Sequence, residues 1–184
     1  MSDPVDTSDL VIRPANDQDA LCLSVLAMQV FLDTYATQGI RVQIAREVLA
    51  SYSEANFAQA ISDPATSIEV AEINAHLVGF AQVTLRASHD LAPNGVQAEL
   101  LRLYVQEPFT GRKVGTDLLH RAEAVASESG ATVLWLTPWV HNHRAIAFYG
   151  KRGYTDYGLT YFNFEGESHL NRVYAKSLNG QRAA

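Results

Sequence analysis

The segment Glu99–Leu119 carries the clearest chemical pattern in this sequence. An apolar, β-rich stretch leads into a loop that contains Gly111, Arg112, Lys113 and Gly115, and a helical pattern follows. The first amides of a helix have no acceptor within the helix, and the helix dipole adds partial positive charge there. Such an end binds a phosphate or pyrophosphate well, and the two cations would add full charges. A solvated turn with two surface cations is the alternative interpretation of the loop taken alone.

The same loop resembles a known motif. Residues Thr110–Gly115 resemble the acetyl-CoA loop of the GNAT N-acetyltransferases, Gln/Arg-x-x-Gly-x-Gly/Ala. Gly115 matches, whereas Thr110 stands in place of Gln or Arg and Lys113 in place of the first motif glycine. A residue with a Cβ resists positive φ, so Lys113 bears on the geometry of the loop. Either its ammonium approaches a phosphate of coenzyme A, or it is an ordinary surface lysine.

A second stretch, Asn142–Tyr154, resembles the other hallmark of that family, Asn-x-x-Ala-x-x-Phe-Tyr-x-x-x-Gly-Phe/Tyr. Every defined position matches, and the resemblance extends over roughly Leu10–Leu178. Within the family, the stretch from Arg102 to Tyr154 looks most like the PaiA-type polyamine acetyltransferases. The resemblance implies an α/β (α+β) GNAT fold, with a single mixed, mostly antiparallel twisted sheet of about six or seven strands and about four or five flanking helices.

Transfer of an acetyl group from a thioester to an amine makes three demands. The amine must lose a proton, the carbonyl oxygen must be stabilised as it gains charge, and the leaving thiolate must be either protonated or tolerated as an anion. No covalent enzyme intermediate is needed, so direct transfer is expected. The resemblance places the hydroxyl of Tyr149 near the coenzyme sulfur as general acid, and a phenol with a pKa of about 10 stays protonated at neutral pH. Core packing is the alternative, since Ala145, Phe148 and Tyr149 recur at helical spacing.

Glu99 is the candidate general base. It occupies the strand position at which some family members carry a base glutamate. Strand alternation places it on the same face as Leu101, Leu103 and Val105, and desolvation among these neighbours would raise the pKa of its carboxyl. An exposed charge that at most attracts a cationic substrate is one alternative, and a water chain acting as the base is another.

The resemblance also implies which residues bind acetyl-CoA, the expected co-substrate. In the family the strand splays, so Val105 would offer its amide to the thioester carbonyl and Leu103 its backbone to the pantetheine arm. Asn142 would hydrogen-bond the pantetheine, although a helix N-cap is an ordinary role for asparagine. The implied set is Leu103, Val105, Thr110, Gly111, Arg112, Lys113, Val114, Gly115, Thr116, Asn142 and Phe148.

Acceptor binding is assigned to the aromatic residues Phe31, Tyr35 and Trp139, which could give apolar or cation–π contact with an ammonium chain. Core packing is the alternative for each. The expected acceptor is a small, polyamine-like amine. A protein N-terminus or lysine, an amino acid and an aminoglycoside are the alternatives. An acyl-CoA sensor without catalysis is the alternative from another class, because Thr110 and Lys113 depart from the motif.

Three other reactive side chains are expected to have no catalytic role. Cys22 falls within a predicted helix with no histidine near it in sequence, and free cysteines are commonly buried. His141 and His143 flank Asn142 but lack further ligands at suitable spacing, so no metal is expected.

Composition limits the class of protein. The 184 residues predict one domain over 1–184, with frayed tails at 1–8 and 179–184. The net charge of −6 argues against a nucleic-acid partner. No apolar run approaches the roughly 18 residues of a membrane helix. The acidic start and single cysteine predict a cytoplasmic protein, and a homodimer is compatible with the sequence.

The elements that must position these residues follow from hydrophobic periodicity and turn residues. Strands are predicted at residues 10–14, 67–73, 76–86, 96–105, 132–139, 155–164 and 172–178. Helices are predicted at 21–35, 42–50, 54–61, 114–127 and 142–152. One apolar face of the first helix comprises Leu21, Val25, Met28, Leu32 and Tyr35. Asn16 offers a cap before that helix, and Gly153 ends the last one.

Overall fold

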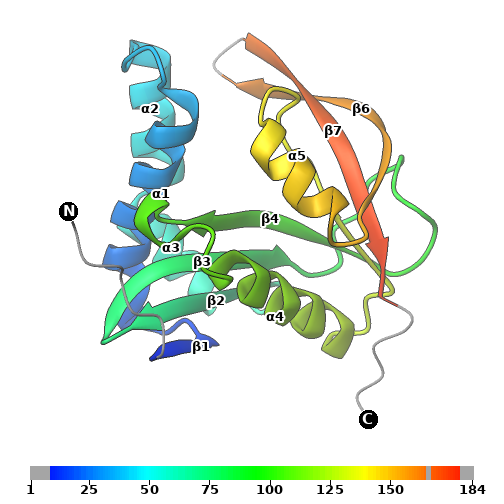
Figure 1. Ribbon diagram of the computed structural model, residues 1–184, viewed down its shortest axis with the longest axis horizontal. Coiled ribbons are helices and arrows are strands. Elements are labelled where there is room, and N and C mark those ends of the chain that lie inside the picture. The colour runs from blue at the N-terminus through cyan, green and yellow to red at the C-terminus, as the bar shows by residue number, and fades with distance from the viewer. Residues whose placement is uncertain (1–8, 165–166, 179–184) are drawn as a thin grey trace. The chain divides into compact units, whose positions relative to one another are not determined.

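The computed structural model describes residues 9–164 and 167–178 (Figure 1). The tails expected at 1–8 and 179–184 lie outside this described part. It contains seven strands, five α-helices and two short 3-10 helices, labelled η. In chain order they are β1 (Leu10–Pro14), η1 (Asp17–Asp19), α1 (Ala20–Tyr35), α2 (Val42–Ser51), α3 (Glu54–Ser62), β2 (Thr66–Ile73), β3 (His76–Thr84), β4 (Gln97–Val105), η2 (Glu107–Phe109), α4 (Val114–Glu128), β5 (Val133–Leu136), α5 (His143–Gly150), β6 (Thr155–Phe164) and β7 (Glu167–Ser177).

The seven strands form one sheet in the order β1-β2-β3-β4-β5-β7-β6. β4 and β5 run parallel, whereas the β1–β2, β5–β7 and β6–β7 pairs are antiparallel. The predicted mixed, mostly antiparallel sheet with five α-helices is therefore confirmed.

The chain divides into two compact units, each described by itself. The first comprises residues 9–82 and 102–122, with α1, α2, α3, η2 and the loop that precedes α4. The second comprises residues 83–101 and 123–178, with β5, α5, β6 and β7. The strands β3 and β4 and the helix α4 each contribute residues to both units.

The core of the first unit corrects the predicted orientation of α1. Leu21 and Val25, on the predicted apolar face, are 56% and 60% exposed. Met28 and Leu32 of the predicted face pack against the core, whose buried α1 residues are Ala20, Leu23, Leu26 and Ala27. Twelve of the sixteen residues of α1 are apolar, so periodicity selected the buried face only in part, and packing against the rest of the unit decided it. Deeper in this core, Phe57 of α3 meets Phe80 of β3 edge-on.

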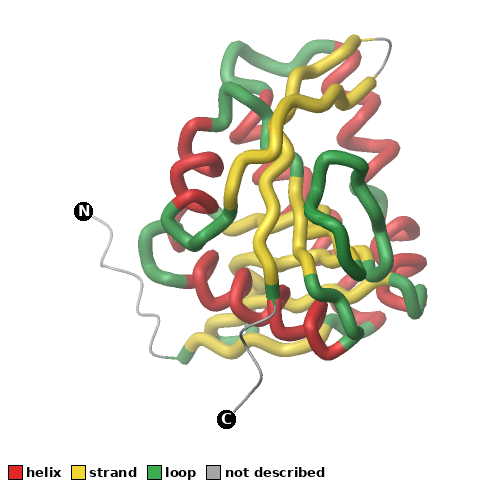
Figure 2. The backbone as a smooth tube through the Cα atoms, turned by 90° about the vertical axis from the view of Figure 1, so that its right-hand side faces the viewer, coloured by secondary structure: helices red, strands yellow, loops and turns green. Residues whose placement is uncertain are grey.

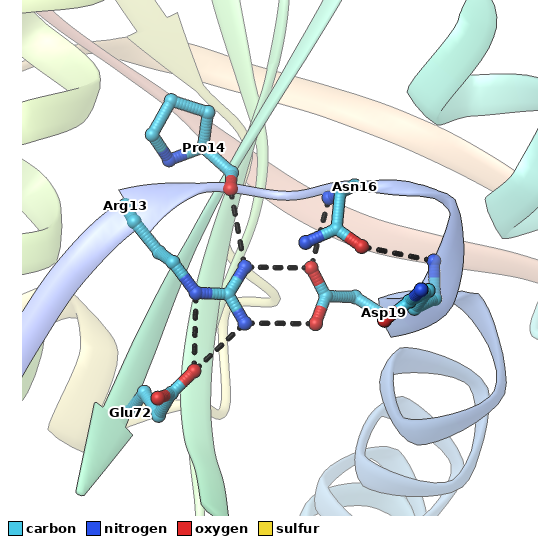
Figure 3. A network of polar contacts seen from close by, with 6 residues as sticks. Arg13, Pro14, Asn16, Asp19 and Glu72 are labelled. Carbon is cyan, nitrogen blue, oxygen red and sulfur yellow. Dashed lines mark hydrogen bonds and ion pairs between the residues drawn. The ribbon is translucent and has the colours of Figure 1, made fainter. Parts of the chain in front are cut away.

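A charged network holds the start of α1 to the first two strands (Figure 3). The Arg13 guanidinium donates to both carboxylate oxygens of Asp19, at 2.7 and 2.9 Å, and to Glu72 of β2 at 2.7 and 3.0 Å. Asp19 also accepts from the Asn16 amide at 2.8 Å, which completes the cap predicted at Asn16. The hydrogen bond from Arg13 lowers the pKa of Asp19 below its ordinary value.

In the second unit, β6 and β7 lie side by side along their length (Figures 1 and 2). The neighbouring strand β5 is buried throughout. It ends at Leu136, three residues before the predicted end at Trp139, because Pro138 follows closely and cannot donate to a ladder. No helix of residues 9–164 and 167–178 is long and apolar enough to cross a membrane.

Candidate active site

The loop before α4 has an unusual backbone. Gly111 has a φ of +73° and Lys113 a φ of +70°, so both residues are left-handed. The backbone turn for which the family motif uses glycine is therefore present at Lys113 despite its Cβ. Holding a non-glycine residue in this region costs about 1–2 kcal/mol, which the surrounding structure must offset.

Lys113 also forms the start of α4. Its carbonyl accepts hydrogen bonds from the amides of Thr116 and Asp117, at 2.7 and 3.0 Å. Val114, the first helical residue, is fully buried and anchors the helix end. The next residue, Gly115, is only half-buried. The first amides of α4 thus lie where a helix end can receive an anion.

The side chains of the loop differ in how they are held. The Thr110 hydroxyl donates to the Glu107 carbonyl at 2.8 Å, and the Arg112 Nε donates to the Pro108 carbonyl at 3.1 Å. Both side chains therefore brace the loop against η2. Lys113 is exposed, so its ammonium is accessible to a charged ligand.

β4 is longer than the segment that pairs with β5. Among the described residues, the two strands pair only over Gln97–Glu99, whereas β4 continues to Val105. The backbone of Leu103 and Val105 therefore lies beyond the β4–β5 pairing. The splayed strand that the resemblance implies at these two residues stays a prediction.

Gly79 of β3 is a residue of this region that the sequence analysis missed. A Cβ at Gly79 would lie 2.7 Å from the Tyr104 carbonyl oxygen and 3.2 Å from both Leu118 and Val105. Only glycine allows β3 to approach the end of β4 and α4 so closely. An isolated glycine within an otherwise alternating strand is the signal that could have identified it.

The helix α5 holds the candidate acid. The Asn142 side chain accepts from the Ala145 amide at 3.0 Å, so Asn142 is the N-cap of the helix. Tyr149 is buried with 8% exposure, and its ring meets Phe148 edge-on at 5.2 Å. The Arg152 guanidinium lies 3.6 Å from the centroid of the half-buried Phe148 ring. Tyr149 thus has a fixed ring position.

Glu99 is half-buried in β4, where it pairs in register with Trp135 of β5. Its neighbour along the same strand face, Leu101, is 42% exposed, and Leu103 and Val105 are half-buried. The expected surroundings are therefore only partly desolvated.

Two of the three predicted acceptor residues come together in the first unit. The rings of Phe31 and Tyr35 are 4.7 Å apart, and burial raises the pKa of Tyr35 to about 12. Tyr52 and Tyr104, which the sequence analysis did not select, complete the cluster. Tyr52 lies 5.3 Å from the Phe31 ring, and its hydroxyl hydrogen-bonds that of Tyr104 at 3.1 Å. The Arg102 guanidinium lies 5.0 Å from the Tyr52 ring.

Trp139, the third predicted acceptor residue, belongs to the second unit. Its ring meets His141 edge-on at 4.9 Å, and its backbone bridges to Asn171 of β7. His141 and His143 are exposed, and no group of three metal-ligating side chains occurs among the residues that the structure describes. Cys22 is exposed on α1, contrary to the expectation of a buried cysteine.

A family model for the acetyltransferase (GNAT) family matches residues 34–154, which include both motifs. The chain belongs to the GNAT family. An uncharacterised N-acetyltransferase of Mycobacterium tuberculosis (strain ATCC 25618 / H37Rv) is 32% identical over 128 residues, which are 70% of this chain and 77% of that relative. This GNAT protein is accordingly an N-acetyltransferase, as its two motifs predict.

The similarity to PaiA-type proteins is also found. A spermidine N(1)-acetyltransferase of Thermoplasma acidophilum is 28% identical over 145 residues, which are 78% of this chain and 86% of that relative. The crystal structure of the PaiA N-acetyltransferase from Thermoplasma acidophilum in complex with coenzyme A has a TM-score of 0.72 at 24% identity, covering 91% of this chain and 98% of that one. The latter similarity establishes the GNAT fold.

Proposed function

We propose that this N-acetyltransferase moves an acetyl group from acetyl-CoA directly to a primary amine of a small, polyamine-like molecule. The observation that carries the proposal is the left-handed turn at Gly111 and Lys113, which opens the N-terminus of α4 to an anion. That turn persists although Lys113 replaces glycine, which argues that a bound phosphate group requires this backbone.

The loop residues Thr110 to Thr116 would hold the pyrophosphate of acetyl-CoA through backbone amides and the helix dipole. Arg112 and Lys113 add positive charge at the same end. Leu103 and Val105 lie beyond the β4–β5 pairing, which leaves their backbone groups on that edge for the pantetheine and the thioester carbonyl. A hydrogen bond from the Val105 amide would stabilise the carbonyl oxygen as it gains charge. Asn142 and Phe148 complete the proposed coenzyme contacts.

Tyr149 acts as the general acid in this proposal. Its hydroxyl gives a proton to the sulfur as the carbon–sulfur bond breaks, so coenzyme A leaves with a protonated thiol. The buried ring of Tyr149, fixed by packing, supports this role because proton transfer requires a held geometry. Glu99 receives a proton from the acceptor ammonium, directly or through a water chain, and the resulting amine attacks the thioester carbonyl carbon. Its half-buried position allows both routes.

Three observations support a polyamine-like acceptor. The relative from Thermoplasma acidophilum is named as a spermidine N(1)-acetyltransferase. The net charge of −6 favours the approach of a cation. Phe31 and Tyr35 form paired rings that could contact an ammonium chain, with Trp139 as a further candidate.

The proposal also includes the location and the partners of the protein. The exposed free thiol of Cys22 and the acidic sequence support a cytoplasmic protein without a nucleic-acid partner, and a homodimer remains part of the proposal.

Release of free coenzyme A tests this function directly. The purified protein is incubated with acetyl-CoA and one amine at a time: polyamines, amino acids, aminoglycosides, and a peptide with a free N-terminus and a lysine. We expect thiol release that depends on a polyamine. Release with the peptide alone would assign the chain to protein acetylation. Tight binding of acetyl-CoA without acceptor-dependent thiol would favour a sensor.

A further inference from the structure

A carboxylate is completely buried in the second unit. Glu123, near the end of α4, has 0% exposure, and its two oxygens accept from the Lys176 Nζ of β7 at 2.8 and 3.0 Å. The same carboxylate accepts from the Tyr154 hydroxyl at 3.1 Å. A buried ion pair seldom stabilises a fold more than apolar residues of similar volume would. A role beyond stability is therefore worth seeking in what the cluster touches.

The end of α5 places this cluster behind the proposed acid. The Tyr154 amide donates to the Tyr149 carbonyl at 3.2 Å, and the Gly153 amide donates to the Gly150 carbonyl at 3.3 Å. Gly153 has a φ of +83°, so the pattern is that of a Schellman motif. This motif brings the flanking side chains together, and the rings of Tyr149 and Tyr154 are 5.6 Å apart.

Tyr154 thus connects Tyr149 to the ion pair. Burial, reinforced by the Glu123 carboxylate and the Tyr149 hydroxyl, raises the pKa of Tyr154 well above its ordinary value, so Tyr154 stays neutral and donates. The Lys176 Nζ also lies 5.6 Å from the Tyr154 ring. Tyr154 is consequently held by Glu123 at its hydroxyl, by Lys176 near its ring and by the Tyr149 carbonyl at its backbone amide.

Three other charged side chains near this cluster have contacts with residues other than Tyr154. Arg152, which follows α5, stacks on Phe148 and donates to the Phe148 carbonyl at 2.9 Å. Asp156 of β6 pairs with Arg172 of β7, and both are part-exposed. Glu123 from α4 and Lys176 from β7 are the ionised groups that contact Tyr154 directly, and their opposite charges balance.

We propose that Glu123 and Lys176 are positioning residues that act through Tyr154, fixing the Tyr149 ring and leaving no net charge on the cluster that the ring packs against. This inference rests on the general-acid role given to Tyr149 in the proposed function. A neutral ion pair leaves the phenol able to give its proton to the sulfur and to recover it from solvent. A single unpaired charge in this cluster would favour either the phenol or the phenolate form of Tyr149, depending on the sign of the charge.

The basic limb of the kcat–pH profile measures this bias, because the acid must be protonated to act. In Glu123→Gln the Lys176 charge remains, favours the phenolate and lowers the pKa of Tyr149, so the limb moves to lower pH. In Lys176→Met the Glu123 charge remains, disfavours the phenolate and moves the limb to higher pH. We expect opposite shifts of roughly one pH unit, the size of an interaction with a nearby charge at a protein interior.

The matched controls remove the same charges at exposed positions of neighbouring helices. Glu128→Gln on α4 and Lys151→Met after α5 should leave the limb in place. The double variant Glu123→Gln/Lys176→Met removes both charges and should return the limb towards its original position. Unshifted limbs in folded single variants, or shifts in the same direction, would overturn the proposal, because a purely structural role predicts no dependence on the sign of the charge.

Tyr154→Phe keeps the test conclusive if a single charge variant fails to fold. It retains the ring and removes only the hydroxyl link, so kcat should fall about tenfold through looser positioning, with the KM for acetyl-CoA unchanged. Wild-type kcat in this variant would overturn the inference.

Tyr149→Phe in the same assay separates the two proposals. If Tyr149→Phe keeps the basic limb, the acid assignment itself fails. If it removes the limb while the charge variants leave it unmoved, only the present inference fails.

Discussion

The two helix ends that carry the family motifs differ in how they obtain their geometry. At the start of α4, Thr110 and Lys113 depart from the motif, yet the backbone keeps two left-handed residues. At α5, every motif position matches, and Asn142 and Gly153 supply the cap and the stop. Helix N-termini bind anions mainly through backbone amides, so the proposed phosphate site at α4 should tolerate a changed side chain. In the proposed function the second site depends on the Tyr149 hydroxyl, and therefore on one residue type at one place.

Replacement of the acid should have the largest effect. Tyr149→Phe should lower kcat by about 10²-fold, because a proton-transfer group contributes on that scale. Stopped or continuous thiol assays measure it. Tyr157→Phe, which removes a hydroxyl from an exposed tyrosine of β6, is the control and should leave kcat unchanged. An undiminished kcat for Tyr149→Phe would show that α5 supplies only packing, and the contrast between the two helix ends would disappear.

A third helix start, at η1, is held by charged side chains, so its contribution to stability should depend on pH. Asp19→Asn should lower the free energy of unfolding by about 2 kcal/mol at pH 7, because the carboxylate accepts three charge-assisted or backbone hydrogen bonds. The pKa of Asp19 is lowered in the folded state, so its contribution is present above the unfolded pKa of about 3.9 and is lost as the pH falls through the folded value.

Chemical denaturation of the wild-type protein and of Asp19→Asn between pH 3 and pH 7 measures the difference between their free energies of unfolding. The gap should be constant near neutrality and shrink in the acidic range. Asp156→Asn, in the part-exposed pair with Arg172, is the control and should change stability by less than about 1 kcal/mol. A gap that widens on acidification would contradict the assigned charge state of Asp19.

Crowding the start of α4 should weaken binding of the coenzyme. Gly115→Leu would place a side chain beside the first amides of the helix, and we expect the Kd for coenzyme A to rise about tenfold or more, which corresponds to about 1.4 kcal/mol. Calorimetry measures it. Gly150→Ala is the matched control, since a Cβ at Gly150 meets nothing within 4 Å. Unchanged affinity in Gly115→Leu would place the phosphates away from this loop.

Two substitutions at residues with nearly equal φ angles should change the free energy of unfolding in opposite directions. Lys113→Gly relieves a Cβ at a φ of +70° and should raise the free energy of unfolding by about 1 kcal/mol, whereas Gly153→Ala adds one at +83° and should lower it similarly. Thermal or chemical denaturation measures both. Lys113→Ala removes the ammonium without relieving the backbone, so a loss of coenzyme affinity shared by the two Lys113 variants would identify a phosphate contact by the ammonium.

Much of the fold was predictable because its patterns are local. The predicted strands and helices appear in order, and the cap at Asn16 and the stop at Gly153 depend on residues close in sequence. The buried face of α1 was predictable only in part, because twelve of its sixteen residues are apolar and more than one face could be buried. The early end of β5 shows a smaller miss, since β-rich composition continues past Leu136 although Pro138 interrupts the ladder.

The candidate site divides in the same way. Residue order alone placed a basic, glycine-containing loop before a helix and an asparagine-capped helix that carries Tyr149, because motifs of this kind are contiguous and their chemistry is set by residue type. Only the tertiary structure decided that Lys113 takes a glycine-like conformation, that Tyr52 and Tyr104 join Phe31, and that Glu123 and Lys176 meet at Tyr154. Those results depend on contacts between segments far apart in the chain, where burial and the geometry of the whole unit select one arrangement among many that the local pattern permits.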